Sequence, residues 1–136
     1  MGVITALFAG KVIDAAGAGV DRAALLARVG LTEDDAPEVR RMVPDEDYYA
    51  LLEEIAAGLR DATDFPLRVG ATMACDDYGA FGLAWKTAPT LRGSLERAER
   101  YARLLTSVSR HEVVDHPEGA LFMLQREGDR RLGLRL

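Results

Sequence analysis

The sequence predicts an α+β fold: a helical cluster followed by, and packed on, a small antiparallel β-meander. Apolar residues recur at helical spacing through most of the chain before Ser107, and the period changes to alternation after that residue. Turns containing Gly119 and Gly128 separate three short alternating segments, which is typical of a meander. A chain of 136 residues has the length of one domain and can bury a core, so we expect a single domain over residues 1–136.

Residues that favour helix starts and ends divide the first part of the chain into helical segments. Asp21 can cap the free backbone N–H groups of a first turn, Pro44 suits a first turn, and Pro89 closes a helical segment. The expected helices cover residues 3–16, 22–29, 44–60, 65–71, 78–86 and 91–106. The buried stripe of the third helix is expected to comprise Tyr48, Leu51, Leu52, Ile55 and Leu59.

The expected strands of the meander cover residues 108–115, 120–126 and 131–136. The middle strand carries Phe122 and Leu124 on one face and Leu121 and Met123 on the other, and apolar residues on both faces predict that both are covered. One face is expected to pack on the helices. The cover of the other face is open between a ligand cavity, more of the domain, another subunit and further helix packing.

Composition and charge weigh against several classes of function. The net charge of −5 weighs against direct binding to phosphate backbones. Residues 23–32 superficially resemble the start of a helix-turn-helix, but acidic residues follow them, so we do not expect this segment to read DNA. A single cysteine, Cys75, allows no internal disulfide and, without an export signal, predicts a cytoplasmic location. No apolar stretch is long enough to span a bilayer, so we expect no membrane partner.

Catalytic and metal-binding patterns are absent from the sequence. His111 and His116 are expected on a strand and in a turn, without metal-ligand spacing. We therefore expect no enzyme activity, no metal and no cofactor, although a haem-ligand role for either histidine remains an alternative. Gly79 and Gly82 lack the surroundings of a phosphate-binding loop, and we expect them to let their helix approach a neighbour closely.

The central region carries aromatic and flexible apolar side chains that are candidates for a small-molecule pocket. Phe81 and Trp85 are four residues apart and share a helix face. Such a stripe more often forms core, and a pocket is the sharper hypothesis, with Arg68 as an anion contact. The candidate ligand-binding residues are Arg68, Met73, Tyr78, Phe81, Trp85, Tyr101 and Met123. A basic end, formed by Arg126, Arg130, Arg131 and Arg135, is interpreted as a solvated strand face or as an anion-binding patch.

Several short runs carry a resemblance to a known family: LLARVGL at 25–31, DFPLRVG at 64–70, GLA at 82–84 and TAPTL at 87–91. With them the chain resembles the first part of the N-terminal effector domain of AraC-type transcriptional regulators, often described as arabinose-binding-type. Pro66 stands where that pattern usually has glycine.

The resemblance implies a sensor domain that binds a small-molecule effector, a partner subunit in a homodimer, or both. The alternative is a structural dimerisation module without a ligand. DNA binding is expected only through a C-terminal domain that is absent from this chain.

Overall fold

The computed structural model describes residues 1–35 and 38–129. Over these ranges the fold is α+β, with six α-helices and two separate two-stranded antiparallel sheets. The elements are β1 (Val3–Thr5), α1 (Ala6–Ala16), α2 (Arg22–Arg28), β2 (Met42–Pro44), α3 (Asp45–Gly58), α4 (Phe65–Ala71), η1 (Cys75–Tyr78), α5 (Gly79–Lys86), α6 (Leu91–Tyr101), η2 (Ala102–Leu104), β3 (Ser109–His116) and β4 (Gly119–Arg126). The predicted fold class is confirmed.

The β1–β2 sheet is an element that the sequence did not predict. Val3–Thr5, expected as the first turn of a helix, pairs instead with Met42–Pro44. The backbone N–H of Thr5 also donates to the carbonyl oxygen of Leu105 at 2.7 Å. β1 therefore ties the start of the chain both to β2 and to the segment just before the hairpin.

Thr5 explains why α1 begins at Ala6 rather than at Val3. Its backbone is extended, and its hydroxyl oxygen accepts a hydrogen bond from the N–H of Leu7 at 3.3 Å. The same hydroxyl donates to the carbonyl oxygen of Val39 at 2.7 Å, so this fully buried polar group is satisfied. A threonine in this role is a favourable helix N-cap.

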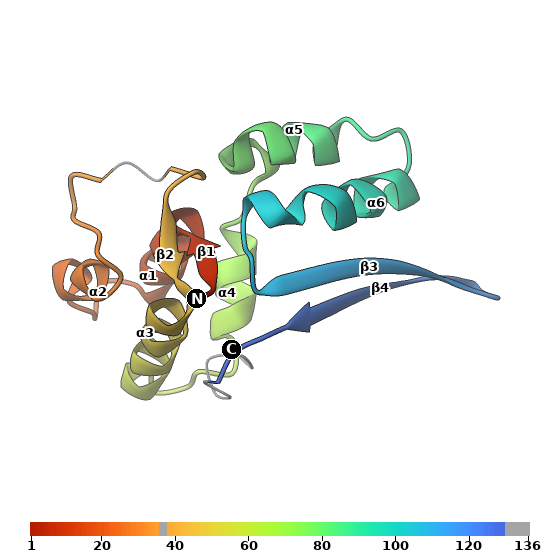
Figure 1. Cartoon of the computed structure of the whole chain (residues 1–136). Coiled ribbons are helices and arrows are strands. Elements are labelled where there is room, and N and C mark those ends of the chain that lie inside the picture. The colour runs from red at the N-terminus through yellow and green to blue at the C-terminus, as the bar shows by residue number, and fades with distance from the viewer. Residues whose placement is uncertain (36–37, 130–136) are drawn as a thin grey trace.

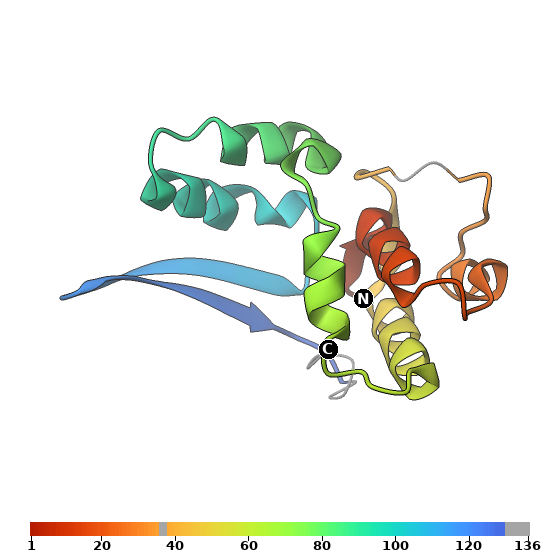
Figure 2. The same cartoon turned by 180° about the vertical axis from the view of Figure 1, so that it is seen from behind.

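The larger of two apolar clusters lies where α1, α2, α3 and α4 meet. Leu51, Leu52 and Ile55 of α3 are buried in it as predicted, and Tyr48 and Leu59 pack against it half-buried. Figure 2 shows α4 between the α1–α3 layer and the α5–α6 pair. The smaller cluster, under α5 and α6, comprises Leu7, Tyr78, Phe81, Ala98, Ala102 and Leu105.

Gly82 allows α5 to pack directly on η1. A Cβ added at this position would lie 1.7 Å from the carbonyl oxygen of Cys75, which no real contact permits. Gly79, at the start of the same helix, has φ of 57°, in the left-handed region that glycine adopts without strain. The expected role of these glycines in close packing is confirmed at Gly82.

β3 and β4 form a hairpin that runs out from the helices beside α6 (Figure 1). Their register extends from Ser109 opposite Arg126 to His116 opposite Gly119, which agrees with the two predicted strands to within one residue. The outer edge of β3 is fixed to α6, because the carboxylate of Glu99 accepts the N–H of Val113 at 3.0 Å. The third predicted strand, and with it Arg130, Arg131 and Arg135, lies outside the described residues.

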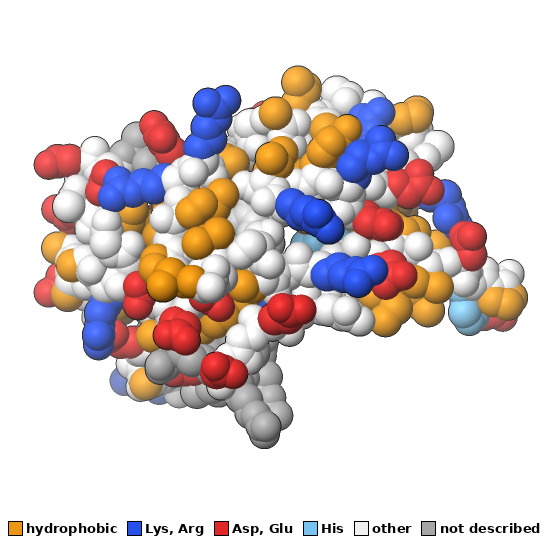
Figure 3. Space-filling view, viewed as in Figure 1, with side chains coloured by type: hydrophobic (Ala, Val, Ile, Leu, Met, Phe, Trp, Pro, Cys, Tyr) orange, Lys and Arg blue, Asp and Glu red, His pale blue; other side chains and the backbone are white. Residues whose placement is uncertain are grey.

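The expected cover over both faces of the middle strand is not observed in the described part of the chain. Leu121, Phe122, Met123 and Leu124 remain 49%, 41%, 41% and 47% exposed. The reason is that α6 lies along the edge of β3, and the face that carries Phe122 and Leu124 borders a cavity instead of closely packed side chains. Figure 3 shows the resulting apolar side chains on the hairpin surface.

Candidate functional site

A small cavity of about 200 Å³ lies between α5, α6 and one face of the hairpin. We call it the aromatic pocket. Its apolar wall comprises Phe8, Tyr78, Phe81, Trp85, Ala98, Ala102, Leu105, Phe122 and Leu124. Its polar lining comprises Thr106, Ser109, His111 and Arg126. An apolar cleft with a few polar groups is the usual construction of a small-molecule site.

The helical wall of the aromatic pocket is a chain of ring contacts. The ring centroids of Phe8 and Tyr78 are 6.0 Å apart, those of Tyr78 and Phe81 are 6.0 Å apart, and those of Phe81 and Trp85 are 5.8 Å apart. Edge-to-face and tilted pairs at these distances are favourable and hold each ring in place. Burial raises the pKa of Tyr78 to about 12, so its phenol is neutral at physiological pH.

The hairpin contributes one face of β3 and β4 to the pocket. The register places Ser109 opposite Arg126 and His111 opposite Leu124, and side chains of directly opposed residues share a face. The rings of His111 and Phe122 are stacked at a tilt, with centroids 5.6 Å apart. Alternation along the strand therefore brings Phe122, Leu124 and Arg126 to the pocket together.

His111, in the polar lining of the pocket, has surroundings that disfavour the charged form of its imidazole. Burial lowers the pKa of its imidazole, and the nearby Arg126 guanidinium lowers it further. Its Nδ1 atom is buried and has no hydrogen-bond partner among the described residues. A buried polar atom in that state usually indicates a missing partner.

The structure brings together only part of the predicted ligand-binding set. Tyr78, Phe81 and Trp85 line the aromatic pocket, and Met73 is half-buried against the same apolar cluster. Their role towards a ligand stays a prediction.

The other predicted residues lie elsewhere. The guanidinium of Arg68, on α4, lies 5.8 Å from the ring centroid of Phe65. Tyr101 is 39% exposed. Met123 is on the opposite face of the hairpin from Phe122, because neighbouring side chains of a strand alternate.

Phe8, His111, Phe122 and Arg126 line the pocket but were not predicted as ligand-binding residues. The alternation of the middle strand already grouped Phe122 with Leu124. The alternation of side chains along the middle strand was therefore the signal that could have found Phe122. What the sequence did not reveal was which of the two faces turns towards α5.

The two largest cavities along the described residues are more polar than the aromatic pocket. One, of about 610 Å³, runs beside β3 between Glu99, Arg103 and Glu127. The other, of about 390 Å³, lies between α1, α2 and η1. In the second, Lys11 Nζ lies 2.7 Å from Asp77 Oδ2, and Arg22 pairs with Asp14. Volume alone does not make either cavity the better ligand site, because neither has the mainly apolar wall of the aromatic pocket.

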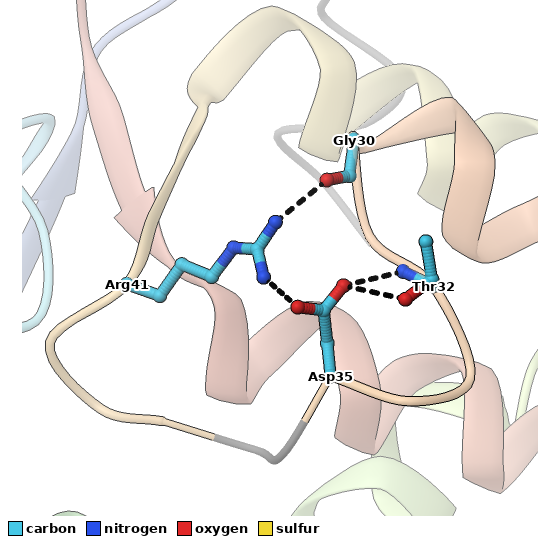
Figure 4. A network of polar contacts seen from close by, with 4 residues as sticks. All are labelled: Gly30, Thr32, Asp35 and Arg41. Atoms are coloured by element: carbon cyan, nitrogen blue, oxygen red, sulfur yellow. Dashed lines mark hydrogen bonds and ion pairs between the residues drawn. The ribbon is translucent and has the colours of Figure 1, made fainter.

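A polar network beside the second cavity joins Arg41, just before β2, to Gly30, Thr32 and Asp35, which follow α2 (Figure 4). The Asp35 carboxylate accepts hydrogen bonds from the N–H of Thr32 at 2.6 Å and from its hydroxyl at 2.9 Å. Arg41 pairs with the same carboxylate and donates to the carbonyl oxygen of Gly30 at 2.9 Å. These contacts, the Thr32 hydrogen bonds first, lower the pKa of Asp35.

Asp35→Asn is expected to destabilise the fold at neutral pH and to weaken its response to acid. A carboxyl whose pKa is lowered by folding stabilises the folded state above its unfolded pKa, about 3.9, and that contribution disappears as the pH falls through the folded pKa. Urea unfolding at pH 7 and in the acid range measures both effects. The exposed neighbour supplies the control, Asp34→Asn, which should match the wild type; equal stability of Asp35→Asn and wild type at pH 7 would refute the role of the network.

Comparison with known protein families gives a match over most of the chain. Residues 19–135 match the family model of the arabinose-binding domain of AraC transcription regulators, N-terminal. No curated protein matches the chain. Among the described residues, no helix has the length and apolar character needed to cross a membrane. The family match extends over most of the sequence and includes α2 to β4, the elements that build most of the aromatic pocket. The chain therefore belongs to the family of N-terminal arabinose-binding domains of AraC transcription regulators.

Proposed function

We propose that this chain is a ligand-sensing domain of an AraC-family transcriptional regulator, and that its small-molecule effector occupies the aromatic pocket. The observation that carries this proposal is the pocket itself: aromatic side chains from α1, α5 and β4 converge on a cavity with a short polar lining. Family membership supports the regulatory role. The proposal assigns no chemical reaction to the chain.

The position of the pocket supports a means of signalling. Its walls come from segments far apart in the sequence, with Phe8 on α1, Trp85 on α5 and Phe122 on β4. A ligand that contacts all three adds a link between the hairpin and the helices. Such a ligand shifts a conformational equilibrium only by its difference in affinity for the two states. A change in the position of the exposed hairpin is the proposed output.

A thermal-shift screen of small metabolites tests the proposal, with Trp85→Ala as the site variant. A bound ligand stabilises the folded state by about 2.7 kcal/mol at roughly a hundredfold excess over Kd, a rise of several degrees in Tm. Removing a large aromatic contact should weaken binding by about tenfold or more. Leu83→Ala, on the same helix but 63% exposed, is the matched control and should keep the wild-type response. An undiminished response in Trp85→Ala would exclude this site.

The second candidate function is a dimerisation module without a ligand. It is favoured by the exposed apolar side chains of β4, together with the outer edge of that strand, which pairs with nothing among the described residues. An unpaired edge is a template for another chain. Light scattering over a range of concentrations separates the two: a strictly monomeric protein that binds a metabolite supports the sensor, and a dimer indifferent to metabolites supports the module.

A further inference from the structure

The aromatic pocket has a distinct polar end. Thr106, Ser109 and Arg126 line this pocket and, together with Phe8, also the small cavity next to it, so they lie where the two meet. Ser109 and Arg126 are opposed in the hairpin register. His111 follows two residues along the same face of β3, and the apolar side chains Leu124 and Phe122 lie farther out towards the hairpin turn. The pocket is therefore apolar along its length and polar at the base of the hairpin.

The charged side chain at that polar end is a cation, Arg126. No aspartate or glutamate of the described residues joins it in the lining. Its field extends beyond the pocket. Burial raises the pKa of Tyr48 and of Tyr49, and Arg126 acts in the opposite direction on both. Arg126 also adds to the lowering of the His111 pKa that burial causes. Arg126 also has other interactions within the chain, and a guanidinium carries five N–H donors, so it can contact a ligand in addition to them.

The size of the pocket limits the ligand. A volume of about 200 Å³ holds about seven water-sized groups at ~30 Å³ each. This matches a single ring or a short aliphatic chain with one head group.

We propose that the ligand of the pocket is a small carboxylate with an apolar body, whose head group lies against Arg126 and His111. This inference rests on the proposed function of the pocket. The aliphatic or aromatic body then lies along Phe81, Trp85 and Phe122. A guanidinium provides charge-assisted hydrogen bonds in a geometry that suits a carboxylate. The hydroxyl groups of Thr106 and Ser109 are further donors at the same end.

Protonation of His111 should be linked to this binding. A carboxylate next to the ring offsets the effect of Arg126 and raises the pKa of His111, so binding takes up a proton when the pH lies between the free and bound pKa values. The other charged groups near His111 are Glu99 and Arg103 from the α6–η2 segment, with Arg110 and Glu127. These four groups surround His111 whether or not a ligand is bound. The affinity for the carboxylate ligand should therefore rise as the pH falls from about 7.5 to about 6.

Three matched probes test the ligand class: hexanoate, hexanamide and hexylamine. Trp85 is the only tryptophan of the chain and lines the pocket, so its fluorescence reports binding directly. We expect hexanoate to bind at about millimolar Kd, about tenfold or more tightly than hexanamide, and hexylamine not to bind. Equal affinity for hexanoate and hexanamide would overturn the carboxylate class while leaving the pocket as a ligand site.

Variants of the polar end complete the test. Arg126→Gln should remove the preference for hexanoate over hexanamide, whereas Arg110→Gln, on the other face of β3, should keep it. His111→Gln should make the Kd for hexanoate independent of pH between about 6 and 7.5. If Arg126→Gln does not fold, the wild-type comparison of the three probes still decides. No fluorescence response to any probe up to about ten times the expected Kd would overturn the ligand class, and the metabolite screen then judges the proposed function separately.

Discussion

Gly82→Ala is expected to lower the free energy of unfolding by about 3 kcal/mol, at the upper end of the range for overpacking. The added methyl group would lie 1.7 Å from the carbonyl oxygen of Cys75 and 2.7 Å from its carbonyl carbon. Because the obstacle is backbone, no side-chain rotation relieves the clash, and α5 must move away from η1. That movement also shifts Phe81 and Trp85, so ligand binding should weaken together with stability. Urea unfolding and Trp85 fluorescence measure the two effects.

Gly10→Ala is the matched control for that variant. Gly10 lies inside α1, and an added Cβ would meet nothing within 4 Å. Alanine at such a site removes the entropic cost of glycine in a helix and should stabilise the protein by about 0.5–1 kcal/mol. Equal stability of Gly82→Ala and Gly10→Ala would contradict close packing of α5 on η1.

Leu51→Ala is expected to lower the free energy of unfolding by about 2–5 kcal/mol. Leu51 is 0% exposed and belongs to the large apolar cluster around α3, so its truncation removes buried apolar surface and leaves a cavity. The chemically identical change Leu67→Ala, on α4 at 76% exposure, should stay within about 0.5 kcal/mol of wild type. Denaturant unfolding of both variants is the measurement. Similar losses in the two would show that α3 is not the centre of the core.

The sequence was sufficient for most elements but not for the three-residue strands, the start of α1 or the end of α6, which was expected at residue 106 and lies at Tyr101. α2, α4, α5 and the two strands of the hairpin have caps, turns or alternation that fix them to within about two residues, as local signals allow. β1 and β2 have three residues each, too few to show alternation. Ile4 also continues the helical stripe of Leu7 and Phe8, which favoured a helix over the strand. Thr5, an N-cap residue, was the local sign of where α1 begins.

The sequence predicted only part of the candidate site, and the reason is physical. Phe81 and Trp85 share a helix face whatever lies opposite, so their grouping is local. Choosing between Met123 and Phe122 requires knowing which face of the hairpin turns towards α5, and a shift of one residue exchanges the faces. Arg126 comes to the pocket only through its pairing with Ser109, which depends on hairpin register and on tertiary packing.

The most direct test of the aromatic pocket is NMR chemical-shift mapping of the protein with a metabolite from the screen or with hexanoate. Trp85 gives a unique indole N–H signal, and His111 and Leu124 report from the hairpin wall. We predict that all of these signals shift as the ligand concentration is raised. Signals of Lys11 and Leu31, in the polar cavity between α1 and α2, should stay in place. Shifts confined to Lys11 and Leu31, with Trp85 unchanged, would contradict the assignment of the effector site.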